Sequence, residues 1–277
     1  MSVSAGAKVQ RRTSGLSDKV RKRIEITILS LPALIMFLGF VILPVFMAGY
    51  YGFFKWKGYG KPTVNGQFIG FENYKVIRTD PNFQQALGHT LFVVVASLVI
   101  QGPLAILFAL LLNQKFKGRA LIRTLIFVPY VVSEVIVGTG WSLILQTTGA
   151  LNALLKKIGL GGADWISDPK IAIWPLMFII SWKYIGFAVI LMIAGMQSFP
   201  EDLYEAAKVD GAGFWRQQWS ITLPLLGPTI RIWAFMSIIG SLQLFDLVYI
   251  IWGQYVSSTA GTSPMATYMV REGRLAN

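Results

Sequence analysis

Three ionisable side chains lie inside long apolar stretches of this 277-residue sequence: Glu134, Lys183 and Asp246. Ionisable groups are costly in apolar surroundings, so each is a candidate for contact with a polar substrate or a transported ion. Each also has a structural explanation, because such a group can pair with a neighbouring helix or reach water from near a helix end. Glu134 lies deeper in its stretch than Asp246 and is the better candidate for a polar cavity. For Asp246, structural pairing is an equally good explanation.

Aromatic and hydroxyl side chains add two more candidate groups. Trp182 and Tyr184 flank Lys183, and this combination suits a sugar, which is bound by hydrogen bonds to its hydroxyls and by stacking on aromatic faces. Ser237 and Ser241 are four residues apart and therefore share one face of a helix. They line a substrate path or pack helices together, and packing is favoured because small residues are common where membrane helices meet.

The composition excludes several kinds of chemistry. The sequence has no Cys and one His, His89, which excludes disulfides, Cys-ligated zinc or iron–sulfur sites, thiol nucleophiles and His-rich metal centres. A membrane enzyme would need a cluster of catalytic side chains, for which His89 alone is not enough. The nucleotide-binding pattern G-x-x-x-x-G-K-[ST] is absent, because residues 60–63 (GKPT) lack the upstream glycine and the hydroxyl after lysine. We therefore expect a non-enzymatic chain that binds no cofactor.

Long apolar segments predict the fold. Hydrophobic residues make up 54% of the sequence and charged residues only 14%, where about 25% charge is usual in soluble domains. A helix needs about 20 apolar residues to cross a bilayer. The segments of that length are about 26–50, 90–112, 124–145, 171–195 and 232–252. We expect an all-α, polytopic helical membrane protein with five visible spans, some of them bent at prolines.

Basic residues predict the orientation. They are dense in the tail of residues 1–25 and occur again in the loops after the second and fourth spans, so these regions are expected in the cytoplasm. Topology and lipid head groups explain the net charge of +12 more simply than nucleic acid does. The tail could be the start of a cleaved signal peptide. A retained first helix is favoured, because the apolar run is too long and no A-x-A site follows it.

Two loops carry local signals. The polar, aromatic-rich segment between the first two spans is expected to be a folded extracytoplasmic loop. Asp80-Pro81 near its end predicts a helix N-terminus ahead of the second span. The segment 198–228 predicts a helix of about ten residues that stops at Gly211, too short to cross a bilayer. A short exposed helix of this kind fits docking to a soluble partner, and equally fits an amphipathic helix on lipid head groups.

The residues of segment 198–228 favour docking. Glu205-Ala206-Ala207, Gly211, Ile221 and Leu223-Pro224 match the EAA signature of binding-protein-dependent ABC importer permeases over 20 residues. Other positions resemble the carbohydrate-uptake branch of that family, the relatives of the maltose and glycerol-phosphate permeases. These positions are Phe68 to Tyr74, Asp80-Pro81, Phe83, Ala86-Leu87, Gly118, Arg123, Pro129, Trp141, Gly149, Asn152 and Phe245-Asp246.

The resemblance implies a type I ABC importer transmembrane domain in a bacterial cytoplasmic membrane. Its expected activity is ATP-driven import of a sugar or oligosaccharide. The expected partners are a second permease, a dimer of ABC ATPases that holds ATP and Mg, and an extracellular solute-binding protein. Glu205 would contact the ATPase, Ala206 and Ala207 would allow close approach, and Gly211 would make the turn. The rest of the expected coupling set is Asp210, Ile221, Leu223 and Pro224.

Two expectations remain beside this one. An ion-coupled secondary transporter would use intramembrane acids such as Glu134 and Asp246, and would not need the EAA pattern. The resemblance also implies six or more spans, with at least one after the loop at 256–269, whereas the sequence ends at Asn277. We therefore expect a truncated or frameshifted reading frame, with residues 253–277 as an extracytoplasmic segment.

Overall fold

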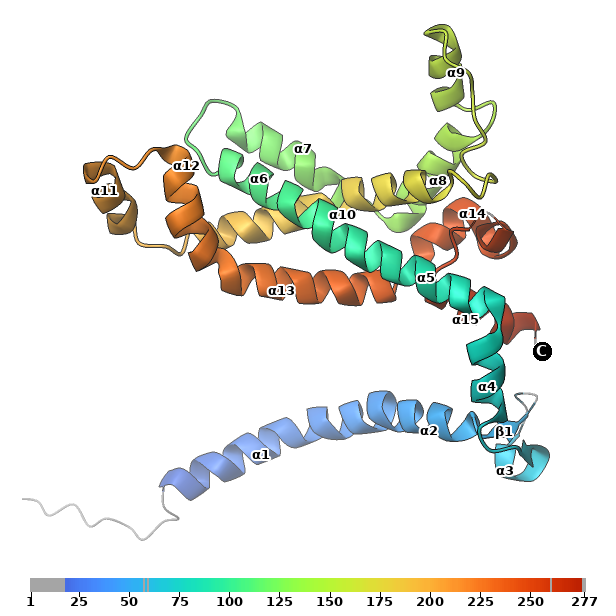
Figure 1. Cartoon of the computed structure of the whole chain (residues 1–277). Coiled ribbons are helices and arrows are strands. Elements are labelled where there is room, and N and C mark those ends of the chain that lie inside the picture. Colours follow the sequence, from blue (N-terminus) through green and yellow to red (C-terminus); the bar gives the residue numbers. More distant parts are fainter. Residues whose placement is uncertain (1–17, 57, 59, 260, 276–277) are drawn as a thin grey trace, which may run out of the picture. The chain divides into compact units, whose positions relative to one another are not determined.

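The computed structural model describes residues 18–56, 58, 60–259 and 261–275, so most of the expected basic tail lies outside the described residues. The chain forms two units, residues 1–75 and 76–277, which are described separately. Both are built from helices (Figure 1). Four helices are long and apolar enough to cross a membrane, and a fifth crossing is possible if one bent helix pair counts as a span. The predicted all-α membrane fold is confirmed.

The first unit contains one long helix and a small folded loop. Helices α1 (Asp18–Phe37) and α2 (Leu43–Tyr51) are continuous through a π-helical turn, η1 (Leu38–Ile42), and include the predicted first span. The loop that follows holds strands β1 (Phe54–Lys55) and β2 (Gln67–Phe68), which pair antiparallel, and helix α3 (Pro62–Asn65). The Asn73 side chain donates to the carbonyls of Gly52 and Phe54, which closes this loop.

The second unit is a helical bundle joined to the first through α4 (Glu72–Thr79). Its first half runs through α5 (Pro81–Ala96), η2 (Ser97–Gln101), α6 (Gly102–Leu112), α7 (Arg119–Val131), α8 (Glu134–Leu145) and α9 (Ala150–Lys157). Its second half runs through α10 (Ile173–Met196), α11 (Asp202–Val209), α12 (Phe214–Gln217), η3 (Gln218–Thr222), α13 (Leu223–Leu242), α14 (Asp246–Thr259) and α15 (Met265–Leu275).

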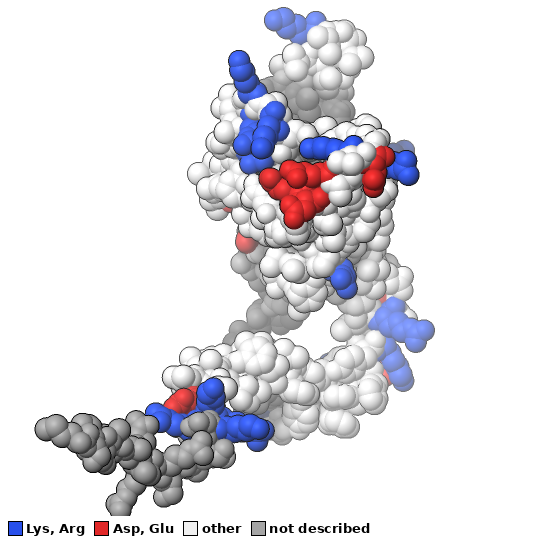
Figure 2. All heavy atoms as spheres, turned by 90° about the vertical axis from the view of Figure 1, so that its left-hand side faces the viewer, with Lys and Arg blue, Asp and Glu red and all other residues white. Residues whose placement is uncertain are grey.

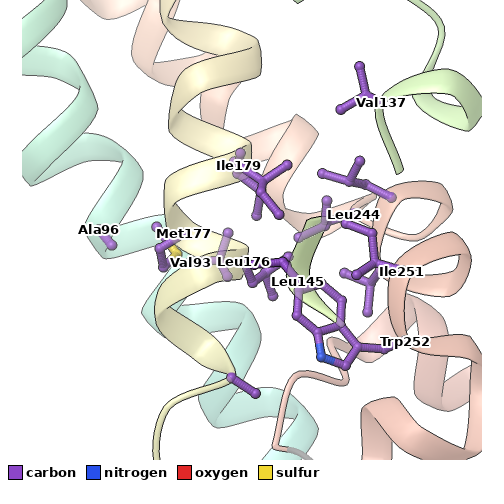
Figure 3. Close-up of a cluster of buried hydrophobic side chains, with 14 residues drawn as sticks. Val93, Ala96, Val137, Leu145, Leu176, Met177, Ile179, Leu244, Ile251 and Trp252 are labelled. Carbon is purple, nitrogen blue, oxygen red and sulfur yellow. The ribbon is translucent and has the colours of Figure 1, made fainter. Parts of the chain in front are cut away.

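Helix α10 lies at the centre of this bundle and packs against α6, α7 and α13, while α14 packs against α8. One buried apolar cluster joins α5, α8, α10 and α14, with Leu176 and Ile179 of α10 in its middle (Figure 3). A second cluster joins α6, α10 and α13 around Met192 and Leu226. The contact between α7 and α10 is close, because a Cβ at Gly186 would lie 2.2 Å from the carbonyl oxygen of Ile126. Small residues let membrane helices approach in this way.

The N-terminus of the second span is confirmed. Asp80 caps α5, since its carboxylate accepts from the backbone N–H of Asn82 at 2.9 Å, and Pro81 occupies the first turn. The helix then continues through η2 and α6 to Leu112. Within the described residues there are three π-helical turns, and each is followed by a helix with proline at its second position: Pro44, Pro103 and Pro224. Proline lacks the N–H of a regular turn, and a wider turn before it accommodates that loss.

The third predicted span is not a single helix. The segment 124–145 falls across α7 and α8, and the pair formed by α7 and residues 134–157 is bent by 94°. The chain leaves the helix at Val132, where ψ is 137°, and Ser133 caps the next helix by accepting from the N–H of Ile136. Pro129 in the last turn of α7 removes a backbone donor, and a serine in N-cap geometry restarts the helix.

The fifth predicted span is also interrupted. Helix α13 already begins at Leu223, inside the segment 198–228 that was expected to be a loop, and it ends at Leu242. Helix α14 starts at Asp246, so the segment 232–252 contains a break. The high overall hydropathy of residues 232–252 hid this break, because hydropathy reports burial in lipid and not helix continuity.

Candidate functional site

Glu205, Ala206 and Ala207 of the EAA signature lie on a short exposed helix at one end of the second unit. Helix α11 follows the end of α10 directly, and the α6–α7 loop lies at the same end (Figure 1). Glu205 and Ala206 are exposed on α11, as are Asp210 and Gly211 just after it, while Ala207 is half-buried. The predicted short helix that stops at Gly211 is confirmed.

Gly211 ends this helix by a defined backbone arrangement. Its φ is +75°, a left-handed conformation that glycine adopts without strain. The N–H of Gly211 donates to the carbonyl of Lys208 at 3.0 Å, and the N–H of Ala212 donates to that of Ala207 at 2.8 Å. This pair of bonds is a Schellman motif, which satisfies the last carbonyls of a helix. Glycine is therefore needed at this position of the signature to give α11 its end and its direction.

A chain of hydroxyls ties α11 to the base of α13. The Tyr204 hydroxyl lies 3.0 Å from Thr222 Oγ1, which in turn donates to Gln218 Oε1 at 2.8 Å. Thr222 and Gln218 belong to η3 and are buried, with exposed fractions of 1% and 6%. The neighbouring Gln217 donates to the carbonyl of Ala212 at 2.7 Å, which holds the turn after α11 against α12.

The surface around α11 combines charge with exposed apolar residues. Acidic side chains gather over α11 and basic ones lie beside them (Figure 2). The exposed acids of this region are Glu201, Asp202, Glu205 and Asp210. A polar hollow of about 590 Å³ lies between α11 and the α6–α7 loop and is lined by Lys115, Arg119 and Tyr204 among others. Val209 is 87% exposed and Trp219 is 69% exposed. Exposed apolar residues within a charged rim are typical of a docking surface.

A second site is a cavity inside the bundle. It has a volume of about 260 Å³ and lies between η2, α7, α10 and α13. Its polar lining is made by Ser97, Gln101, Ser237 and Ser241. The Ser97 hydroxyl lies 2.7 Å from both Gln101 Oε1 and Ser237 Oγ. Its aromatic lining is made by Tyr130, Tyr184, Phe187 and Trp233, with Tyr130 and Phe187 stacked at 5.1 Å. Hydroxyls beside aromatic faces can hold a polar, ring-shaped molecule.

The structure separates the three neighbours Trp182, Lys183 and Tyr184. Tyr184 lines the cavity and donates a hydrogen bond to the Glu134 carboxylate, so two of the predicted pathway residues meet here. Lys183 is 3% exposed, and its ammonium group lies 2.7 Å from the carbonyl of Val132 and 3.4 Å from that of Pro129. It therefore caps the C-terminus of α7. Trp182 packs edge-on against Trp141. Consecutive residues on a helix point about 100° apart, which is why they diverge.

The serines and Asp246 have different surroundings. Ser237 and Ser241 both line the cavity, and Ser237 also joins α13 to η2, so the two roles considered from the sequence coexist at this residue. Asp246 is exposed at the first residue of α14 and is not part of the cavity lining. In the described part of the chain, no group of three His, Cys, Asp or Glu residues is placed to hold a metal ion.

Among the cavity residues that were not predicted from the sequence are Ser97, Gln101, Tyr130 and Trp233. Ser97 and Gln101 are polar residues four apart within an uncharged apolar run, and this spacing is a readable signal of a shared helix face. Tyr130 and Trp233 had no such signal. Aromatic residues are common in membrane helices, and only the packing of α7 and α13 shows that these two face inwards.

Comparisons with known proteins identify the family of this chain. Residues 101–273 match the family described as binding-protein-dependent transport system inner membrane component. Among similar curated proteins is the probable starch degradation products transport system permease protein AmyD of Thermoanaerobacterium thermosulfurigenes, 31% identical over 86% of this chain and 78% of the relative. Another is the trehalose/maltose transport system permease protein MalF of Thermococcus litoralis, 32% identical over 80% of this chain and 75% of the relative.

Solved structures give the same result. A chain from the crystal structure of a bacterial alginate ABC transporter, in complex with an alginate pentasaccharide-bound periplasmic protein, superposes with a TM-score of 0.76. It is 27% identical in sequence, and the match covers 93% of this chain and 86% of that one. The family match covers more than half of the sequence. The structure has Glu205, Ala206 and Ala207 on an exposed helix and several helices apolar enough to cross a membrane. This multi-pass membrane protein therefore belongs to the binding-protein-dependent transport system inner membrane components.

Proposed function

We propose that this chain is the permease subunit of an ATP-driven ABC importer for a sugar or oligosaccharide. The observation that carries the proposal is the EAA segment, folded as exposed helix α11 with a Schellman end at Gly211. The names of the similar permeases, for starch degradation products and for trehalose and maltose, support the substrate class.

In this proposal α11 docks into a cytoplasmic ATPase, which holds ATP and Mg, while this chain is a non-catalytic membrane subunit. Glu205 and Asp210 present carboxylates to the ATPase, and Val209 presents apolar surface between them. Ala206 and Ala207 are small enough for close approach. Ile221 lies in η3, and Leu223 and Pro224 begin α13, through which docking reaches the bundle. A second permease and an extracellular solute-binding protein complete the assembly, as the alginate transporter structure with its periplasmic protein suggests.

The cavity is this chain's share of the translocation pathway. Its volume of about 260 Å³ is just below the range of about 300–1,000 Å³ that is usual for small-molecule sites, as expected if a second permease supplies the other wall. Ser237, Ser241 and Gln101 offer hydrogen bonds to sugar hydroxyls, and Tyr184 is oriented by Glu134.

The α11 end of the second unit faces the cytoplasm in this proposal. The basic α6–α7 loop and the α10–α13 segment line one hollow at that end, which agrees with an excess of Lys and Arg on the cytoplasmic side. The same rule puts the N-terminus of the chain in the cytoplasm of a bacterial cell.

Two glycines in one loop allow a matched test of this function. Gly211 has a φ of +75°, whereas Gly213 has a φ of −67°, and a Cβ meets nothing within 4 Å at either position. A left-handed conformation costs a non-glycine residue about 1–3 kcal/mol, so Gly211→Val should distort the end of α11 and Gly213→Val should not. We expect Gly211→Val to abolish sugar uptake in cells while the protein remains in the membrane, and Gly213→Val to transport normally.

Charge reversal tests the partner directly. Glu205→Lys should lose the ATPase from the purified complex, because the Glu205 side chain is exposed and makes no hydrogen bond or ion pair with the described residues that would explain a structural effect. Normal uptake by both Glu205→Lys and Gly211→Val would refute the docking role of α11.

A further inference from the structure

Helix α11 is held to the rest of the bundle by few interactions. None of its residues is buried, and it is joined to α10 and α12 by short connecting segments. Among the side-chain hydrogen bonds of the described residues, the bond from Tyr204 to Thr222 links α11 to another helical element. The second tie of this region, from Gln217 to Ala212, acts on the turn after the helix and not on α11 itself.

The two hydroxyls have a fixed direction of donation. Thr222 has a single hydroxyl proton, and it donates that proton to Gln218 Oε1. Thr222 Oγ1 can therefore only accept from Tyr204, so the order is Tyr204 to Thr222 to Gln218. Hydrogen bonds in such a chain polarise one another, and Thr222 and Gln218 are buried, where each bond is stronger than in water.

This chain of bonds ends in a segment whose winding differs from that of a regular α-helix. Gln218 and Thr222 are the first and last residues of the π-helical turn η3, which leads directly into α13. A π-helical turn inside a helix is a local irregularity, often found at functional positions. Helix α13 carries Ser237 and Ser241 of the cavity. Ser237 is 15 residues beyond Thr222, which is about 22 Å along a helix.

We infer that Tyr204 is a positioning residue that transmits movement of α11 to η3, and through α13 to the serines of the cavity. This inference rests on the proposed function, because it assumes that a partner moves α11. It adds a mechanical link that the EAA residues do not supply. If the Tyr204–Thr222 bond is removed, a docked α11 can move while the base of α13 stays in place.

The test uses the complete importer, reconstituted in lipid vesicles with its second permease, ATPase and binding protein. The measured quantity is the number of ATP molecules hydrolysed per sugar molecule imported. Tyr204→Phe removes only the donor hydroxyl, Thr222→Val removes its acceptor at nearly constant volume, and Thr222→Ser keeps the acceptor. We expect Tyr204→Phe and Thr222→Val each to raise the ratio about two- to tenfold, the equivalent of one neutral hydrogen bond.

Two further measurements separate transmission from simple folding. The ratio of ATP hydrolysed to sugar imported should be no higher in the double variant Tyr204→Phe/Thr222→Val than in either single variant, because both substitutions remove the same bond. Thr222→Ser should have the wild-type ratio. The amount of ATPase bound per permease should stay at the wild-type level, which a loosened or unfolded α11 would not allow. Ser198→Ala is the matched control, since that hydroxyl in the same loop bonds only to Gly195 in its own turn.

The outcomes distinguish this inference from the proposed function. A wild-type ratio in Tyr204→Phe and Thr222→Val, in complexes that import sugar and retain the ATPase, would overturn the relay and leave the proposed function intact. Loss of bound ATPase in these variants would also overturn the relay, because the bond would then only stabilise α11. A wild-type chain that neither binds an ATPase nor imports sugar would overturn the proposed function itself.

Discussion

The Tyr268 hydroxyl of α15 bonds to the residue that caps the N-terminus of α5. Tyr268 donates to the carboxylate of Asp80 at 2.6 Å, and Asp80 also caps α5. This bond is the largest reason why the pKa of Asp80 lies below its ordinary value. Burial, followed by the bond to Asp80, raises the pKa of Tyr268 to about 12. The anchor of α15 is therefore a pair in which a neutral phenol bonds an ionised carboxylate.

The signs of these shifts define a pH window for the contact. Asp80 has a lowered pKa in the folded chain, so its stabilisation is present above the ordinary value of about 3.9 and is lost as the pH falls through the folded value. Tyr268 has a raised pKa, so its stabilisation is present below the ordinary value of about 10 and is lost as the pH rises towards about 12. The Asp80–Tyr268 bond should therefore stabilise the contact between α5 and α15 from about pH 4 to about pH 10.

Ultraviolet absorbance of tyrosinate can check this prediction. The titration of wild-type protein minus that of Tyr268→Phe isolates one phenol, and we expect its midpoint near 12. In the Asp80→Asn background the midpoint should fall towards 10, because the neighbouring carboxylate charge is gone. A midpoint that is the same in both backgrounds would show that the two side chains do not meet in solution.

At the scale of elements, the sequence predicted local structure well wherever a backbone signal was strong. Asp80-Pro81 and Gly211 each combine a residue type with a required backbone geometry, and both ends were placed correctly. The bends inside apolar runs were missed. Pro129 was visible, but a proline in a membrane helix can either kink it or end it, and the choice depends on which neighbour satisfies the freed carbonyls. Here the carbonyls of Pro129 and Val132, at the end of α7, accept from Lys183, 54 residues beyond Pro129 in the chain.

The candidate sites also differ in whether a local sequence pattern or long-range packing determines them. Glu205, Ala206 and Ala207 are consecutive, and a local pattern sufficed to place them on one exposed helix. The cavity draws on η2, α7, α10 and α13, so its lining depends on how these helices rotate against each other. No local pattern contains that rotation, which is why Tyr184 was anticipated only together with two neighbours that point elsewhere.

The break between α7 and α8 should depend on Lys183. Lys183→Met keeps the length and apolar stem of the side chain but leaves the carbonyls of Val132 and Pro129 without their donor. We expect a loss of about 2 kcal/mol in the free energy of unfolding, since an unsatisfied buried polar group costs about 1–3 kcal/mol. Thermal unfolding in detergent measures this, with the exposed Lys170→Met as control. Equal stability of the two variants, with altered sugar preference in Lys183→Met, would instead make Lys183 a substrate contact.

At the scale of the molecule, the bent pair decides how the two ends of the bundle are reached. Helix α10 has 24 residues, about 36 Å, and can cross a hydrocarbon core of about 30 Å alone. The α6–α7 loop and α11 lie at one end of the second unit, and α9 lies at the other (Figure 1). Residue 114 precedes the bent pair of α7 and residues 134–157, and residue 209 follows α10. If α10 crosses the membrane once, these two residues lie on the same side only if the bent pair also makes one full crossing, in the opposite direction.

The absence of native cysteines allows this arrangement to be tested with single cysteine variants in intact cells. Gln114→Cys, Leu160→Cys and Val209→Cys each introduce one thiol at an exposed position on the α6–α7 loop, after α9 and at the end of α11. We expect a membrane-impermeant maleimide to label position 160 from outside, and positions 114 and 209 only after the cells are opened. Labelling of 114 and 160 from the same side would mean that the bent pair re-enters its own face of the bilayer. The cavity could not then connect the two sides, and the pathway proposed here would have to be abandoned even if α11 still bound an ATPase.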